Sequence, residues 1–496
     1  MILSCQNLSK TFVDRPILKQ ASFQLEEHEK AAIVGVNGAG KTTLLKMIIG
    51  QLPADEGLIT FAKDKTFGYL AQQSDLSSSH TIYEELLSVK QDLISMEQQL
   101  RDLEESMKHC EGTQLEEIMN RYTRMTHDFE VRGGLLYKSE LTGVLKGLSF
   151  LDEDFDKQIS TLSGGQKTRV SLAKLLLQSP DLIILDEPTN HLDIASISWL
   201  ETYLRSYKGA VLIVSHDRYF LDRVVTKVIA IENGLVRSYA GNYSDYAAKA
   251  AMLRKAAVNA YLKQQEEIHH QQQVIDKLKS FNREKSIKRA ESREKMLDKM
   301  ELLEKPVEIR DDMHLKLTPQ IISGNDVLSI EDLSKHFGSL TLFEHVDIEI
   351  KRGEHVAIIG DNGTGKTTLL KIINELESMD SGQIRLGSKV EIGYYDQEHH
   401  VLHSEKTLFD EISDDYPTLT NTQIRNTLAA FLFTGDDVFK KISELSGGER
   451  GRVSLAKLML SNANFLILDE PTNHLDITSK EILEQALNDY EGTVLY

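Results

Sequence analysis

Two glycine-rich segments of this 496-residue chain have the residue types needed to bind phosphate. The first, residues 35–42, ends in Lys41 and Thr42, and the second, residues 360–367, repeats it 325 positions later. Glycines let backbone N–H groups curl around a triphosphate, while the lysine reaches the terminal phosphates and the hydroxyl can bind Mg²⁺. Both segments therefore predict a nucleotide site.

Paired carboxylates are the second feature suited to phosphate chemistry. Asp186 and Glu187 follow the apolar residues 182–185, and a copy 283 positions later contains Asp469 and Glu470. The first acid of a pair can hold Mg²⁺ through its water shell, and the second can polarise the attacking water. We therefore expect Glu187 and Glu470 to be the catalytic bases, with a surface N-cap as the alternative for Glu187.

His216 follows the apolar residues 211–214, where it could contact the terminal phosphate of a nucleotide. A histidine at the end of a strand is often structural, so the phosphate role depends on the neighbouring motifs.

The elements that must position these groups are a strand, a loop and a helix. Apolar runs at residues 31–34 and 356–359 precede the two glycine-rich loops, and helical stretches follow at residues 43–49 and 368–373. This order is typical of an α/β phosphate-loop fold.

The motif Leu-Ser-Gly-Gly occurs at residues 162–165 and again at residues 445–448. With the glycine-rich loops and the Asp-Glu pairs, it resembles the ATP-binding cassette superfamily. In that family two cassettes close head to tail, and each ATP lies between the phosphate loop of one and the Ser-Gly-Gly helix start of the other. A helix N-terminus presents N–H groups and a positive dipole to the γ-phosphate.

The resemblance implies two composite sites that bind ATP and Mg²⁺. In site one the ATP-binding residues would be Phe12, Gly35, Asn37, Gly38, Gly40, Lys41, Thr42, Thr43 and Gln72, with Ser446, Gly447 and Gly448 from the second cassette. In site two they would be Phe337, Gly360, Asn362, Gly363, Gly365, Lys366, Thr367, Thr368 and Gln397, with Ser163, Gly164 and Gly165 from the first. The metal ligands would be Thr42, Gln72 and Asp186, and Thr367, Gln397 and Asp469.

Further roles follow from the same resemblance. The catalytic residues would be Glu187 and His216 in site one and Glu470 in site two, while Asp193 and Asp476 would couple the cassettes. Phe12 and Phe337 would stack on adenine, and core packing is an equal alternative for both rings.

The first cassette carries about 42 residues more than the second, around residues 84–130. Apolar residues recur every three or four positions on both sides of Gly112, which predicts an antiparallel helical hairpin, here called the arm. Between Glu84 and Glu130 there are 12 acidic and 5 basic residues, a net charge of −7. The arm is therefore expected to avoid RNA phosphates; a basic protein surface and plain solvent are equal alternatives for it.

Residues 244–306 form a linker rich in Ala, Gln, Glu, Lys and Leu, which predicts long helices. Eight Lys or Arg residues and three Glu lie within residues 277–295, a local charge of +5 in a chain of −19. Such a cluster attracts polyanions, although a solvated linker with ion pairs between turns is the alternative. A bend at residues 280–282 would place much of this charge at the tip.

The tandem cassettes, the arm, the charged linker and Asp-Glu-Pro-Thr-Asn-His-Leu-Asp in both copies resemble the ABC-F group of cytoplasmic ATPases. Members bind the tRNA exit site of the ribosome, reach toward the peptidyl-site tRNA with the linker, and act in translation or protect ribosomes from antibiotics. The resemblance implies an ATP hydrolase that contacts rRNA and tRNA through the basic linker, as a monomer with paired cassettes. An ATPase subunit of a membrane transporter and a DNA-associated ATPase are the alternatives.

Composition agrees with a soluble globular protein, at 41% hydrophobic and 27% charged residues with only two cysteines. No apolar run approaches the roughly 18 residues of a membrane helix, so a cytoplasmic protein without membrane insertion is expected. The expected domains are residues 1–243, 244–306 and 325–496. The counterpart of His216 would fall at position 499, so we expect the second cassette to be truncated before its histidine.

Overall fold

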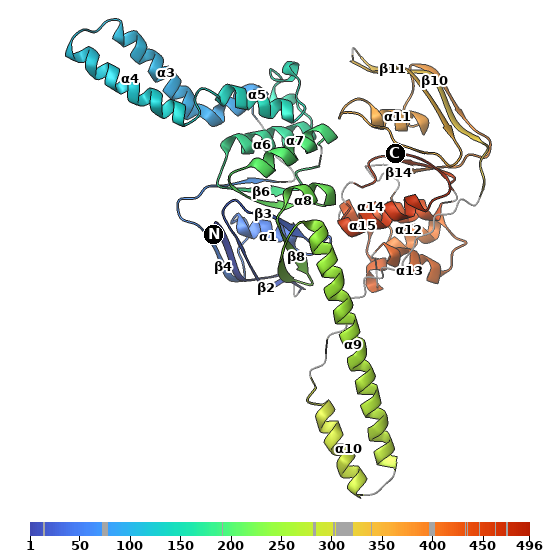
Figure 1. The fold of residues 1–496 in the computed structure, drawn as a ribbon. Helices are drawn as coiled ribbons and strands as arrows, with labels where there is room; N and C mark the ends of the chain where they lie inside the picture. The colour runs from blue at the N-terminus through green and yellow to red at the C-terminus, as the bar shows by residue number, and fades with distance from the viewer. Residues whose placement is uncertain are drawn as a thin grey trace. The chain divides into compact units, whose positions relative to one another are not determined.

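The computed structural model describes residues 1–12, 15–71, 78–190, 192–280, 284–300, 303, 321–338, 340–395, 402–431, 433, 435–445, 447–461, 463–472 and 475–496. The chain forms two compact units (Figure 1). The first unit joins Met1–Tyr239 with His314–Tyr496 and contains both cassettes, and the second unit, Ala240–Met313, contains the linker.

The first cassette is built on a six-stranded sheet of order β5-β6-β7-β3-β8-β9. The strands are β3 Lys30–Val34, β5 Phe67–Leu70, β6 Leu182–Asp186, β7 Ala210–Val214, β8 Lys227–Glu232 and β9 Leu235–Ala240. Strand β3 pairs in parallel with both β7 and β8, and every residue of β3, β6 and β7 is buried. Continuous apolar runs therefore form the centre of this sheet, as is usual for parallel strands covered on both faces.

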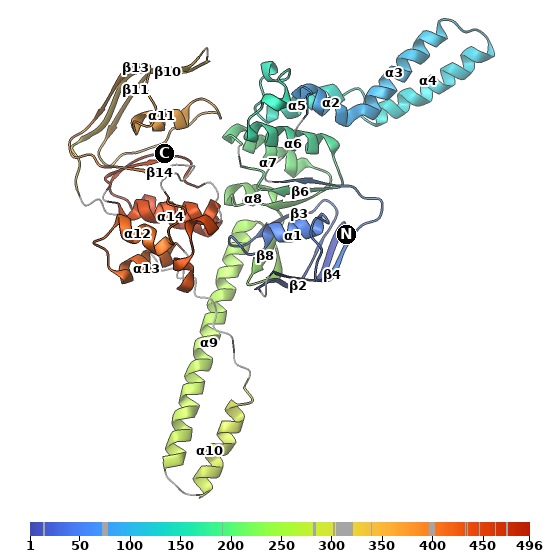
Figure 2. The same cartoon turned by 180° about the vertical axis from the view of Figure 1, so that it is seen from behind.

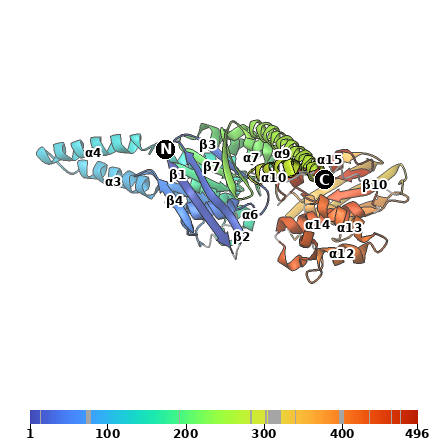
Figure 3. The same ribbon diagram turned by 90° about the horizontal axis from the view of Figure 1, so that it is seen from below.

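A second, antiparallel sheet of order β2-β1-β4 belongs to the same cassette (Figure 3). Its strands are β1 Leu3–Phe12, β2 Arg15–Leu25 and β4 Glu56–Phe61. One hydrophobic core joins Leu8 and Leu18 of this sheet to Leu44 of helix α1 and Ile184 of β6. Apart from the arm and the two helices beside it, the helices of this cassette are α1 Lys41–Ile48, α6 Gly164–Gln178, α7 Ile194–Ser206 and α8 Arg218–Val224, with short 3₁₀ turns η2 Asp152–Asp154 and η3 Ile159–Thr161.

The arm is a pair of helices, α3 Gln91–Met107 and α4 Thr113–Val131, that projects from the first cassette (Figures 1 and 2). Leu93, Leu100, Phe129 and Tyr137 form its hydrophobic core, as the apolar spacing predicts. The helices α2 Ile82–Leu87 and α5 Tyr137–Gly147 flank it.

The apolar spacing of the first arm helix extends back to Leu86 in α2, but α2 and α3 are not one continuous helix. A 3₁₀ turn, η1 Ser88–Lys90, separates α2 from α3, and the Ser88 hydroxyl donates to the carbonyl of Glu85 at 2.6 Å. A serine that bonds the backbone of the preceding turn competes with regular helix geometry.

The second cassette repeats both sheets, and among the described residues the antiparallel sheet again has three strands and the parallel sheet has four. The antiparallel sheet β11-β10-β13 is followed by a parallel sheet of order β12-β16-β15-β14. Its strands are β10 Asp326–Phe337, β11 Leu340–Lys351, β12 His355–Val356, β13 Ser381–Leu386, β14 Ile392–Tyr395, β15 Phe465–Leu468 and β16 Thr493–Leu495. Its helices are α11 Lys366–Ile373, α12 Leu408–Asp415, α13 Asn421–Ala430, α14 Gly447–Leu460 and α15 Ile477–Asn488, with 3₁₀ turns η4 Gly435–Phe439 and η5 Ile442–Glu444.

The strand before the second glycine-rich loop is shorter than predicted. It ends at Val356, whereas the apolar run continues to Ile359, which is 78% exposed. Strand β12 pairs with β16 over two residues, His355 with Val494 and Val356 with Leu495. Strand β3 pairs over four residues with each of β7 and β8.

The second unit is a hairpin of α9 Tyr243–Ser280 and α10 Glu284–Leu297, here called the linker hairpin (Figure 2). Ile275 of α9 and Ala290 of α10 are buried. Two helices are observed as predicted, and residues 281–282 of the bend expected at residues 280–282 lie outside the described part of the chain. Of the helices that the structure describes, none is long and apolar enough to cross a membrane.

Candidate nucleotide sites

The glycine-rich loop of site one joins β3 to α1 and depends on its glycines. Gly40 has φ +100°, and a Cβ atom there would lie 2.5 Å from the Cγ2 atom of Ile17. Both the backbone conformation and the space therefore require glycine. The buried Lys41 ammonium group donates to the carbonyls of Gly35 at 2.8 Å and Val36 at 3.1 Å, so the cation is held against the loop.

A cavity of ≈ 460 Å³ lies over this loop and is lined by both cassettes. The first cassette contributes Phe12, Ile17, Asn37, Gly38, Gly40, Lys41, Thr42, Thr43, Asp186, Glu187, Asn190, Val214 and His216. The second contributes Gly447, Gly448, Leu475 and Lys480. The structure thus brings together most of the residues predicted for site one. Gln72 and Ser446 lie outside the described residues, as does Gln397 of site two.

The paired carboxylates of site one stand at the end of β6. Burial raises the pKa of Asp186 to about 6. Burial also raises the pKa of Glu187 to about 7, although a hydrogen bond from the backbone N–H of His216 lowers it. A pKa near the working pH suits a group that must accept a proton.

The Glu187 side chain points into the site rather than capping a helix. Its residue has φ +51°, and the helix that follows, α7, is capped by Asp193. One oxygen accepts the His216 backbone N–H at 3.3 Å, while the other, Oε1, has no hydrogen-bond partner among the described residues. Such a buried oxygen without a partner suits a water or substrate proton. The N-cap interpretation is therefore wrong.

His216 lies beside this carboxylate, with its Nε2 atom 3.6 Å from Oε1 of Glu187. Burial, aided by the positive charge of Lys41, lowers the pKa of His216 to about 3. The ring is therefore neutral at physiological pH and can accept or donate a hydrogen bond in the cavity.

Helix α15 of the second cassette contacts the first site directly. Its N-cap, Asp476, accepts the backbone N–H of Ser479 at 2.8 Å and the backbone N–H of Asn37 at 3.2 Å. Arg218 of α8 donates to Glu484 on the same helix at 2.8 Å. The cross-cassette role expected for Asp476 thus has a specific hydrogen bond to the glycine-rich loop of site one.

Site two has the same local geometry. Lys366 donates to the carbonyls of Gly360 at 2.7 Å and Asp361 at 2.8 Å. The Thr367 hydroxyl donates to Asp469 at 3.1 Å, so the predicted hydroxyl and carboxylate ligands are adjacent. Gly363 and Gly365 have φ +86° and +95°, and Glu470 has φ +47°. Asn362 and Thr368, which were also predicted for site two, occupy the same places in this loop as Asn37 and Thr43 in the first.

The residues that the first cassette would lend to site two are engaged within their own cassette. Ser163 caps α6, where its hydroxyl accepts the N–H of Gln166 at 3.3 Å and Gly164 and Gly165 begin the helix. Asp193 accepts hydrogen bonds from the Ser196 N–H at 2.7 Å and the Ser149 hydroxyl at 3.1 Å. Asp193 therefore does not repeat the contact that Asp476 makes.

The two candidate adenine-stacking rings are exposed. Phe12 is 44% and Phe337 49% exposed, so the core-packing alternative is wrong for both. The ammonium group of Lys10 lies 5.6 Å from the Phe12 ring centre, and that of Lys335 lies 4.9 Å from the Phe337 ring centre. Both rings are accessible to a flat ligand.

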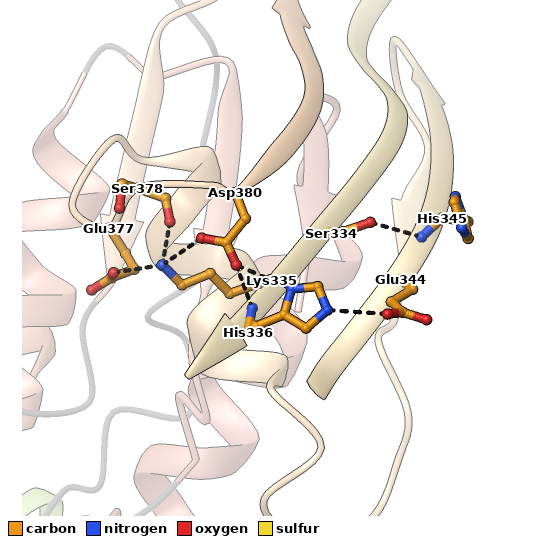
Figure 4. A network of polar contacts seen from close by, with 8 residues as sticks. All are labelled: Ser334, Lys335, His336, Glu344, His345, Glu377, Ser378 and Asp380. Atoms are coloured by element: carbon orange, nitrogen blue, oxygen red, sulfur yellow. Dashed lines mark hydrogen bonds and ion pairs between the residues drawn. The ribbon is translucent and has the colours of Figure 1, made fainter. Parts of the chain in front are cut away.

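A polar network holds the strand that carries Phe337 (Figure 4). The buried Lys335 donates to Glu377 at 3.0 Å, and the backbone N–H of His336 donates to Asp380 at 2.6 Å. The His336 ring contacts Glu344 at 3.0 Å and Asp380 at 3.2 Å, and these two hydrogen bonds raise the pKa of His336. The position 325 residues earlier is Thr11, which has no ring to titrate.

The donor set at both sites fits Mg²⁺. Each site offers one hydroxyl and one buried carboxylate, Thr42 with Asp186 and Thr367 with Asp469. Within the described ranges no group of three or more His, Cys, Asp or Glu side chains could hold a metal ion. Mg²⁺ suits such a small set, because it keeps several waters and binds one or two carboxylates together with substrate phosphates.

Sequence reasoning did not single out Asn190, Arg218 or Lys480. Asn190 lies within the motif Asp-Glu-Pro-Thr-Asn-His-Leu-Asp, in which only the acidic residues have expected roles. Lys480 breaks the repeat, because Ile197 stands 283 positions earlier, and this mismatch is the sequence signal that distinguishes Lys480.

The fold and the cavity define a phosphate-loop ATPase made of two paired cassettes. A family model described as ABC transporter matches residues 18–190 and 343–473, and a second model of the same description matches residues 229–317. The chain is 50% identical over 499 residues to the protein YdiF of Bacillus subtilis (strain 168), covering 100% of this chain and 77% of YdiF. It is 35% identical over 511 residues to ABC transporter F family member 5 of Arabidopsis thaliana, covering 99% of this chain and 71% of that protein.

The chain therefore belongs to the ABC-F family of ATP-binding cassette ATPases. Among solved structures it is similar to the archaeal ribosome recycling factor aABCE1 in complex with the ribosomal stalk protein aP1. That similarity has a TM-score of 0.59 at 20% identity and covers 99% of this chain and 83% of the other, which shows a shared fold. The predicted fold class, tandem α/β cassettes with a helical arm and a helical linker, is confirmed.

Proposed function

We propose that this cytoplasmic ATPase binds ATP at two composite sites and couples binding and hydrolysis to ribosome association, in translation or in protecting ribosomes from antibiotics. The observation that carries the proposal is the cavity of site one, which is lined by the glycine-rich loop of the first cassette and by Gly447 and Gly448 of the second. A ligand that fills this cavity touches both cassettes, so its binding free energy favours the paired arrangement.

The hydrolytic step follows from the residues of site one. Glu187 accepts a proton from the attacking water, whose oxygen bonds to the γ-phosphorus while the bond to the bridging oxygen of ADP breaks. Lys41, the loop N–H groups and the neutral His216 neutralise or hydrogen-bond the γ-phosphate oxygens. Bound Mg²⁺, held through Thr42 and Asp186, would offset phosphate charge. In site two Glu470, Lys366 and Asp469 have the roles that Glu187, Lys41 and Asp186 have in site one. The other residues predicted to bind ATP in the sequence analysis are proposed to do so.

The linker hairpin is the proposed contact to ribosomal RNA and tRNA. Lys277, Arg289 and Lys295 are exposed on it. Two further cations are used between the helices, since Lys279 pairs with Glu294 at 2.6 Å and Arg293 donates to Gln271 at 2.5 Å. Those pairs hold the hairpin together, and the exposed cations are the ones that phosphate groups would meet.

Other parts of the chain have less specific roles in the proposal. The proposed domains are the first cassette at residues 1–243, the linker at residues 244–306 and the second cassette at residues 325–496. The chain is proposed to act as a monomer. The similarity to aABCE1 is one of fold and does not support ribosome binding by itself. The proposal of ribosome binding rests on the charge and length of the linker hairpin and on the family.

Co-sedimentation with ribosomes tests the proposal. The variant Glu187→Gln with Glu470→Gln should pellet with ribosomes in ATP and not in ADP, because it binds ATP without releasing it as product. The matched control adds Lys277→Gln, Arg289→Gln and Lys295→Gln, and it should pellet several-fold less at the same salt concentration.

Absence of ATP-dependent pelleting would contradict the ribosome proposal. Stronger competition by duplex DNA than by structured RNA at matched salt would favour the DNA-associated alternative instead. ATP hydrolysis that requires added membranes would favour the transporter alternative.

A further inference from the structure

Lys480 brings a positive charge from the second cassette into site one. It lies on α15 and lines the cavity together with Glu187 and Gly448. The side chain is partly buried, and burial lowers the pKa of Lys480 while the neighbouring carboxylates of Glu187 and Asp217 raise it. A lysine so placed carries its charge on the wall of a cavity built for a polyanion.

Contacts on both sides of Lys480 fix its helix against the first cassette. One residue before the helix, Asp476 accepts the Asn37 N–H at 3.2 Å. One turn beyond Lys480, Glu484 accepts from Arg218 at 2.8 Å, and Glu481 lies 3.5 Å from the same guanidinium group. The lysine therefore stands on a helix turn that is held at both ends.

The charges that act on the Lys480 ammonium group are the carboxylates of Glu187, Asp217, Glu484 and Asp476, but among the described residues none of them lies close enough to form a hydrogen bond or ion pair with it. The other interface charges on α15 are already paired with Arg218. A half-buried cation without a close partner is costly unless an anion joins it. The γ-phosphate of ATP is the group that the cavity would bring there.

The first cassette has no cation at the matching position of α7. In α7, Ile197 stands where α15 has Lys480, and Ser198 stands for Glu481. Glu201, the counterpart of Glu484, pairs with Arg223 of its own cassette at 2.8 Å. The repeat is thus broken at Lys480 and Glu481, whereas the aspartate at the helix start and the glutamate one turn later are present in both copies.

We propose that Lys480 is an ATP-recognising residue of site one that acts across the cassette pair, binding the terminal phosphate of ATP with its ammonium group. Because Ile197 occupies the equivalent position, site two gains no such charge from α7. This inference rests on the proposed function, since it takes the cavity as an ATP site. Its consequence is that site one distinguishes ATP from ADP more strongly than site two.

Calorimetric titration of the full chain tests the inference. The background is Lys366→Ala, which weakens site two, and the probes are the non-hydrolysable β,γ-imido analogue of ATP, and ADP. Lys480→Met should weaken analogue binding about tenfold, the loss of one charge-assisted contact, and change ADP binding less than about twofold. Lys480→Arg should restore analogue affinity to within about threefold. Ile197→Met, the matched control, should leave both affinities unchanged.

Several outcomes separate the two claims. Equal losses for the analogue and ADP, unchanged analogue affinity in Lys480→Met, or failure of Lys480→Arg to restore it would overturn the role of Lys480. Lys480→Gln provides a second neutral variant, and its agreement with Lys480→Met supports a charge effect rather than a packing effect. A background protein that binds neither nucleotide would instead overturn the proposed function of the site.

Discussion

The two nucleotide sites share their local sequence and backbone but differ in what surrounds them. Glu187 and Glu470 both have a left-handed backbone, with φ +51° and +47°, yet the Glu187 side chain is only 11% exposed and Glu470 is exposed. Asp476 reaches the loop of the opposite cassette, whereas Asp193 bonds Ser149 in its own. The comparison shows that the local motif determines the backbone conformation of each site, whereas contacts with the opposite cassette determine how deeply the site's side chains are buried and which charges lie near them.

The largest effect should come from the two candidate bases. Glu187→Gln keeps the size of the side chain and removes its proton acceptor, so phosphate release should fall about a hundredfold or more when Glu470→Gln is also present. We expect Glu187→Gln alone to cause more of the loss than Glu470→Gln alone, because site one is completed by the second cassette. ATP affinity of the double variant, measured by calorimetry, should stay within about threefold of the parent.

Unchanged hydrolysis in the double variant would refute the base assignment. Equal losses in the two single variants would remove the proposed difference between the sites.

The next largest difference between the cassettes should be in the free energy of unfolding lost when one buried ion pair in each is broken. The fully buried Glu411 pairs with Lys457 at 2.5 Å, whereas its counterpart Glu85 pairs with Lys174, a lysine whose side chain is 32% exposed. Lys457→Met should cost about 3 kcal/mol of unfolding free energy, because it leaves a buried charge without its closest cation. Lys174→Met should cost about 1 kcal/mol, since water reaches that pair.

Urea unfolding of the full chain, followed by fluorescence, measures both changes. A larger loss for Lys174→Met would contradict the burial argument.

The two helix-capping aspartates offer a more selective comparison. Asp476→Ala and Asp193→Ala each remove an N-cap and should cost about 1 kcal/mol of stability. Only Asp476→Ala should also weaken ATP binding at site one, by roughly fivefold, because only Asp476 contacts Asn37. Thermal unfolding and calorimetric titration check the two parts separately, and equal effects on ATP affinity would count against cross-cassette coupling.

The smallest expected effect is a pH dependence confined to the second cassette. The pKa of His336 is raised by Glu344 and Asp380, so its stabilising charge is present below the unfolded-state pKa and is lost as pH rises through the higher folded-state pKa. His336→Thr, which copies Thr11, should therefore melt lower than the parent at about pH 6 and nearly alike at about pH 8. His345, whose pKa Asp332 also raises, is present in both proteins and cancels. A difference between the two proteins that does not change with pH would contradict this account.

Sequence accounts for the parts of the sites that depend on short segments. The loop glycines, Lys41 and the Asp186 and Glu187 pair could be predicted, because strand, turn and helix preferences are local. The exposure of Phe12 could not, because it depends on which face of an antiparallel sheet stays open. The break between α2 and α3 at Ser88 is a single side-chain hydrogen bond that a spacing rule does not detect.

Contacts between cassettes were the hardest to predict. Arg218 and Glu484 are 266 residues apart, and neither belongs to a motif. The sequence repeat shows which residues of α15 and α7 correspond. Only the structure shows that α15 contacts the first site, and that Glu201 of α7 pairs with Arg223 of its own cassette.

The most direct measurement is chemical crosslinking between the cassettes of the full chain. Arg218→Cys with Glu484→Cys, combined with Cys110→Ser, gives a pair that a short bismaleimide can bridge. Cys5 can stay because it is buried, which raises the pKa of its thiol to about 12. Arg223→Cys with Glu201→Cys, within the first cassette, is the matched control. We predict efficient crosslinking of both pairs in saturating ATP; crosslinking of the control pair alone would contradict the claim that the second cassette completes site one.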